Sequence, residues 1–317
     1  MKKKTLVILC SVLGILMILG VVVGLGVTMP VAPEADATGE NVIVAEIYFG
    51  DSERPYKQIK RSDFSNDFGY AGDNIFKNDS YLQSANVRIE LLDNINVGGT
   101  PLAVYVGADK TVEFNGNGYT INGDVSGAPI MRVLSQSNGG KVVINNLNMD
   151  NTLASCLQPS FGVTLDFNKC YLKGARQVIY LADSCTLNIN SGTVLDGMYA
   201  VFAPTSKVNT VNVNRGSSLH GSTAAILISQ GSEFTLNVNG GIVKATNETA
   251  NSIIVQKSVG NVYVNVDNGY LYGNFDAISY ADIHLNSGKL VGAINADAAD
   301  LTTGENFIIE PFESEVA

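Results

Sequence analysis

A lysine, an aspartate and a histidine recur at one position of a short repeated motif. They are Lys173, Asp196 and His220, and each lies between a leucine and a glycine. If the copies stack, a base, a carboxylate and an imidazole lie within reach of one another, and Asp196 should raise the pKa of His220. Glycosidases, however, use two carboxylates, and we expect this row to supply Asp196 alone. We therefore favour a solvated face of alternating charge and keep a catalytic trio as the alternative.

A second polar set recurs in copies of a strand-like pattern such as Thr186-Leu-Asn-Ile-Asn. Alternation with period two predicts that the apolar residues point inward and the residues between them outward. The resulting outward row contains Asp166, Asn188, Asn212, Asn237 and Asn265. Amides about 4.8 Å apart can hydrogen-bond along a stack without any ligand. We expect this structural role, and the same five residues are our candidates if the face binds glycan hydroxyls.

The strands that hold both rows return at nearly constant spacing. From Asn145 to Asn286 the repeat asparagine (aspartate once) recurs in steps of 23, 22, 24, 25, 28 and 19 residues. Such a return predicts a solenoid with loops of unequal length on one side. Three strand-like stretches per coil, with no helical stretch between them, predict a parallel β-helix, right-handed by the usual chirality of parallel crossovers. A leucine-rich repeat is the runner-up, but its consensus is missing.

Residues 86–294 resemble the right-handed parallel β-helix of pectate-lyase-like proteins. The stretches NVRIELLDNINV and LAVYVGADKTVEFNGNGYTING are similar to the opening coils of β-helical, adhesin-like bacterial surface proteins. The resemblance implies the fold more firmly than the function, because this helix carries lyases, hydrolases and adhesins. Lyases of this fold bind calcium through clustered aspartates, and polygalacturonase-type hydrolases have Asp-Asp and Gly-His-Gly patterns. The sequence contains neither feature, so we expect no metal, and it contains no cofactor motif.

The N-terminal region predicts localisation of the main part of the chain outside the cytoplasm. Residues 6–27 form an uncharged run after three lysines, which predicts a single-pass transmembrane anchor with the lysines in the cytoplasm. A cleaved signal peptide, cut near Ala37, is the alternative. Residues 28–40 predict a linker, and the aromatic-rich residues 41–85 a cap over the first coil, with an aromatic ligand platform as the alternative. Residues 295–317 predict a closing strand and an acidic tail.

Composition excludes one class of partner and leaves several others open. The formal net charge of −10 argues against nucleic acid. Cys156, Cys170 and Cys185 share no ladder and no metal-ligand spacing, so we expect buried free thiols. We therefore expect an all-β, surface-displayed parallel β-helix that acts as an adhesin-like, glycan-binding or structural module for a glycan or cell-surface ligand. The alternative is a polysaccharide lyase or glycoside hydrolase.

Overall fold

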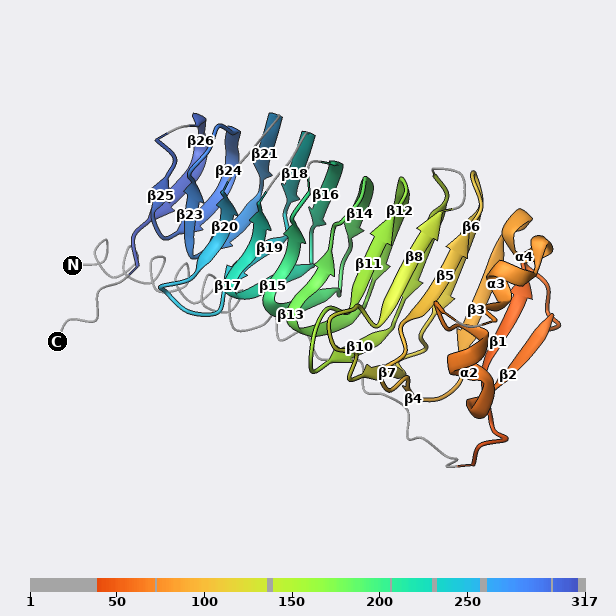
Figure 1. Cartoon of the computed structure of the whole chain (residues 1–317). Coiled ribbons are helices and arrows are strands. Elements are labelled where there is room, and N and C mark those ends of the chain that lie inside the picture. The colour runs from red at the N-terminus through yellow and green to blue at the C-terminus, as the bar shows by residue number, and fades with distance from the viewer. Residues whose placement is uncertain are drawn as a thin grey trace, which may run out of the picture. The chain divides into compact units, whose positions relative to one another are not determined.

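The chain folds as an all-β, parallel β-solenoid of about eight turns (Figure 1). The structure, a computed structural model, describes residues 39–71, 73–135, 139–205, 207–229, 233–256, 261–297 and 299–312. The solenoid predicted from the repeat is therefore confirmed. Within these ranges no helix is long and apolar enough to span a membrane, and the candidate anchor at residues 6–27 lies outside them.

Strand pairing in the described chain follows three parallel ladders. The first ladder contains β3 (Val87–Leu91), β6 (Thr111–Asn115), β9 (Lys141–Asn145), β12 (Val163–Asn168), β14 (Cys185–Ile189), β16 (Val208–Asn214), β18 (Glu233–Asn239), β21 (Asn261–Asp267) and the first halves of β24 (Asp282–Val291) and β26 (Asp300–Glu310).

The second ladder contains β4 (Ile95–Asn96), β7 (Thr120–Gly123), β10 (Asn148–Asn151), the first halves of β13 (Tyr171–Tyr180), β15 (Val194–Ala203) and β17 (Ser218–Ile228), then β19 (Ile242–Ala245), β22 (Gly269–Tyr272) and the second halves of β24 and β26. The third contains β5 (Leu102–Val106), β8 (Met131–Ser135), β11 (Leu157–Ser160), the second halves of β13, β15 and β17, then β20 (Asn251–Val255), β23 (Asn274–Ala277) and β25 (Ile294–Asn295).

The hydrophobic core runs through the inside of the coils. Leu187 pairs in register with Val211, and Val211 pairs with Leu236. All three are fully buried, as the alternating pattern predicts. The asparagines between them are only half-buried, so each first-ladder strand has a dry inner and a wetter outer side.

Glycines allow the chain to turn between ladders. Gly192 and Gly216 follow the first-ladder strands and both have φ of +79°, in the left-handed region that favours glycine. Gly221 serves a different purpose at the corner between the second and third ladders. A Cβ atom there would lie 2.1 Å from the backbone of Ala224, so close packing of the corner requires glycine.

The first coil is covered by an antiparallel and helical layer. This layer consists of β1 (Ile43–Phe49), β2 (Lys57–Lys60), α2 (Arg61–Asp67), α3 (Ile75–Asn78) and α4 (Ser80–Ser84). Strand β1 pairs with β3, the first strand of the first ladder. Near the first strand of the third ladder, Ala103 N donates to Phe68 O at 2.7 Å. The layer therefore satisfies edge groups that the first coil would otherwise expose.

Candidate functional site

The side chains of the outward asparagine row of the first ladder hydrogen-bond to one another from coil to coil. Asn188 Nδ2 donates to Asp166 Oδ1 at 2.6 Å, and Asn212 Nδ2 donates to Asn188 Oδ1 at 2.7 Å. The same bond continues from Asn237 at 2.8 Å and from Asn265 at 2.9 Å. The structure thus brings together all five residues named as glycan-binding candidates. Much of their hydrogen-bonding capacity is already used between neighbouring coils.

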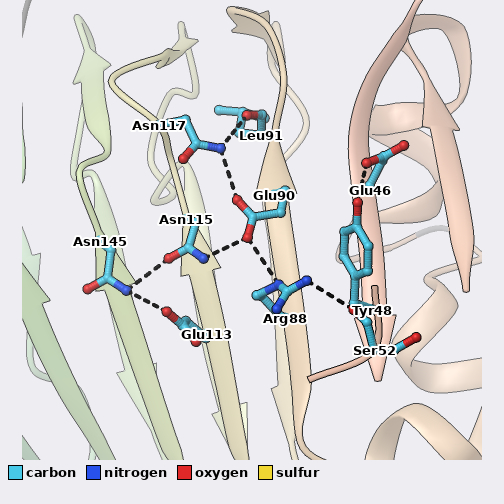
Figure 2. A network of polar contacts seen from close by, with 10 residues as sticks. All are labelled: Glu46, Tyr48, Ser52, Arg88, Glu90, Leu91, Glu113, Asn115, Asn117 and Asn145. Carbon is cyan, nitrogen blue, oxygen red and sulfur yellow. Dashed lines mark hydrogen bonds and ion pairs between the residues drawn. The ribbon is translucent and has the colours of Figure 1, made fainter. Parts of the chain in front are cut away.

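A second asparagine row lies beside the first on the same ladder. Asn145 Nδ2 donates to Asn115 Oδ1 at 2.8 Å, and Asn115 Nδ2 donates to Glu90 Oε1 at 2.8 Å (Figure 2). In both rows the amides donate towards the N-terminal coil, and the chain of bonds ends on a carboxylate, Glu90 here and Asp166 in the first row. A charged acceptor strengthens the bond that it receives, and aligned amides polarise one another. The hydrogen bonds of the two rows therefore link neighbouring coils of the sheet.

The row of possible acid–base groups is longer than the sequence indicated. Strand pairing places Lys173, Asp196 and His220 on consecutive coils of the second ladder. It also makes Asp150 the register partner of Lys173 on the preceding coil. The expectation that Asp196 is the row's single carboxylate is therefore wrong.

Asp150 escaped notice because its strand departs from the repeat. Its neighbours are Met149 and Asn151, where the next three coils have leucine and glycine. Spacing would have found it: Asp150 follows Asn145 by five residues, the same distance that separates Lys173 from Asn168.

His220 is more buried than expected for a residue on the predicted solvated face. Its Nε2 atom lies 2.6 Å from Ser218 Oγ. Burial is the largest influence and lowers the pKa of His220 below its usual 6.5; Lys244 lowers it further, while Asp196 opposes the shift. Asp196 acts on this pKa in the predicted direction, but the expected net rise is wrong, because desolvation outweighs the single charge.

A groove of about 290 Å³ lies on the outward side of the third ladder. Its walls include Arg132, Gln158, Arg176, Gln177 and Tyr180. Gln158 is the register partner of Arg132 on the next coil. Arg132 Nε is buried without a hydrogen-bond partner in the described structure, and Arg176 is exposed. The groove therefore offers two guanidinium groups, two amides and a phenol ring.

Aromatic rings continue from this groove along the same ladder. The ring centroids of Tyr180 and Phe202 lie 5.7 Å apart, and Tyr199 stacks on Phe202 at 5.6 Å with an interplanar angle of 25°. Tyr199 and Phe202 also pack against a small apolar cluster separate from the main core, formed by Ala224, Leu227 and Ile254. The rings are thus held in place by packing. The sequence showed only that these strands are unusually apolar, and it did not identify the groove.

The three cysteines that the structure describes take no part in these surfaces. Cys156, Cys170 and Cys185 are buried and unpaired, as predicted. Burial raises the pKa of all three thiols, to about 12 for Cys170 and Cys185, so they remain protonated at neutral pH. Among the residues that the structure describes, no group of three or more His, Cys, Asp or Glu side chains is arranged to hold a metal ion.

Comparisons with known proteins add no further constraint. No protein-family model matches the chain, and searches of curated proteins and of solved structures give no match. The function is therefore argued from geometry and chemistry alone.

Proposed function

We propose that this protein is an adhesin-like, surface-displayed β-helix that binds saccharides through the third-ladder groove. The observation that carries the proposal is the combination of amides, guanidinium groups and fixed aromatic rings along one ladder. Amides and guanidinium groups hydrogen-bond to hydroxyls and carboxylates, while the apolar faces of sugar rings pack on Tyr180 and its neighbours. Arg132 and Arg176 favour a saccharide that carries acidic groups.

The rest of the fold has a supporting role in this proposal. We take the helix to be right-handed with three strands per coil, as in the pectate-lyase-like proteins that the sequence resembles. The first-ladder asparagines, Asn188 and Asn212 among them, hold the coils in register. Residues 6–27 anchor the chain, or direct its secretion, so that the β-helix faces the cell exterior. Protease added to intact cells should then remove everything after about residue 30. A protein that survives this treatment intact would contradict the placement.

A glycan array probed with the full-length chain tests the binding proposal. We expect retention on a subset of saccharides, with acidic members preferred. Tyr180→Ala and Arg176→Gln should each weaken that binding by about tenfold, or about 1.4 kcal/mol. Arg215→Gln is the matched control, because Arg215 is an exposed arginine outside the groove. Equal effects of the two arginine variants would place the ligand elsewhere.

Asp150 gives the enzymatic alternative a specific basis. Asp150 and Asp196 flank Lys173 and lie two coils apart, about 9.6 Å at the usual strand spacing. Inverting glycosidases place their carboxyl groups about 6.5–9.5 Å apart, so the pair lies at the wide limit. The Tyr171 hydroxyl donates to Asp196 Oδ2 at 3.5 Å. In this alternative, Asp150 and Asp196 act as acid and base beside Lys173 and His220.

A reducing-end assay on acidic and neutral polysaccharides separates the two functions. The binding proposal expects no new reducing ends. Cleavage by the wild-type chain that is lost in both Asp150→Asn and Asp196→Asn would establish the enzyme instead. Asp276→Asn is the control, because this carboxylate lies on the third ladder.

A further inference from the structure

A second cavity, larger than the third-ladder groove, lies in the layer that covers the first coil. This cap cleft has a volume of about 510 Å³ and is bordered by residues of β2, α2, α3 and α4. Figure 1 shows these elements at the end of the solenoid opposite β26. The cleft is therefore remote from the third-ladder rings and needs an explanation of its own.

The aromatic residues of the cap divide into two groups with different surroundings. Phe64, Phe68 and Phe76 are buried and form the packing layer over the first coil. Tyr56 and Tyr81 line the cleft and are 47% and 73% exposed. Such exposure shows that both tyrosines contribute little to the core. The Tyr81 ring is available to a ligand, and the Tyr56 ring, whose centroid lies 4.4 Å from that of Phe49, exposes its remaining surface.

One carboxylate accepts hydrogen bonds from both tyrosine residues. Asp79 Oδ2 accepts a hydrogen bond from the Tyr56 hydroxyl, and Asp79 Oδ1 accepts one from Tyr81 N at 2.9 Å. The second bond caps the start of α4, which carries Tyr81. The Tyr56 ring and the backbone that carries Tyr81 are consequently preorganised, which lowers the entropic cost of binding.

The charge of the cleft selects the ligand. Three carboxylates line it, from Asp67, Asp73 and Asp79, against one cation, Lys57. Lys57 Nζ lies 3.0 Å from Asp67 Oδ2, so the lysine offsets that carboxylate and leaves an excess of negative charge at Asp73 and Asp79. Exposed aromatic rings beside uncompensated carboxylates attract a cation, through the ring quadrupole and through charge-assisted hydrogen bonds.

We propose that the cap cleft is a separate saccharide site, selective for sugars that carry a free amino group. The ammonium group is held by Asp73 and Asp79, and the sugar ring packs on Tyr56 and Tyr81. A lysine side chain would satisfy the carboxylates but would leave most of the aromatic surface uncovered. A cationic sugar uses both features of the cleft.

The test compares two oligosaccharides that differ in charge. Calorimetric titration of the full-length chain with a β-1,4-linked glucosamine hexamer should give at least tenfold tighter binding than its fully N-acetylated counterpart. Tyr81→Ala and Asp73→Asn should each weaken the glucosamine interaction by about tenfold. Asp51→Asn removes the same charge from an exposed position outside the cleft and should leave it unchanged. Tyr180→Ala should also leave it unchanged, so this result stands apart from that of the third-ladder groove.

Three outcomes would overturn the proposal. Equal affinity for the two hexamers would show that the amino group is not recognised. An effect of Asp51→Asn as large as that of Asp73→Asn would mean that the net charge of −10 attracts any polycation. If Nα-acetyl-lysine amide, which keeps its side-chain ammonium group, binds as tightly as the glucosamine hexamer, the cleft would be assigned to a basic peptide.

Discussion

Replacing single asparagines tests whether the first-ladder row stabilises the fold. Asn212 makes two bonds along the row: it donates to Asn188 at 2.7 Å and accepts from Asn237 at 2.8 Å. Asn265, nearer the end of the row, donates to Asn237 at 2.9 Å and makes one such bond in the described structure. The same substitution therefore removes two bonds at one position and one at the other.

The expected magnitudes follow from this difference. A protein hydrogen bond contributes about 1 kcal/mol net, and its loss leaves a half-buried partner unsatisfied. Asn212→Ala should lower the free energy of unfolding by about 2 kcal/mol, and Asn265→Ala by about 1 kcal/mol. Urea titration followed by circular dichroism measures both, and an unchanged slope with denaturant shows that the unfolding transition is the same. Equal losses, or no loss at Asn212, would refute the view that the amides act as linked structural bonds.

Three further predictions follow from burial. Val211→Asp should destabilise the chain by several kcal/mol in the same titration, because Val211 is fully buried, whereas Asn212→Asp should cost far less; equal damage would mean that the register is wrong. Because the pKa of His220 is lowered in the folded chain, the unfolded chain binds more protons below about pH 6.5. The free energy of unfolding should therefore decrease as the pH is lowered from 7.5 to 5. His220→Gln should show a smaller decrease, and an identical decrease would exclude His220 as the cause. The thiols of Cys170 and Cys185 should react with a disulfide reagent at pH 8 only after unfolding, since burial raises the pKa of both to about 12; rapid reaction of the native chain would contradict this.

The sequence was sufficient to predict the rows along the solenoid. Leu187, Val211 and Leu236 point inward, and the asparagines between them outward, because a strand alternates its faces and a repeat fixes which residues stack. Both properties are local or periodic, so they can be read without coordinates. The buried, unpaired cysteines followed from the same counting.

Only the tertiary structure determines how buried the side chains of each row are and where concave surfaces form. The place of Asp150 in the second-ladder row could still have been read from its spacing to Asn145, whereas the burial that reverses the expected pKa shift of His220 could not. The third-ladder groove and the cap cleft depend on side chains such as Arg132 with Arg176, or Tyr56 with Tyr81, whose proximity follows from how coils and loops pack. A periodic pattern determines which face a residue occupies. Desolvation and concavity depend on distant segments, which is why no local pattern encoded them.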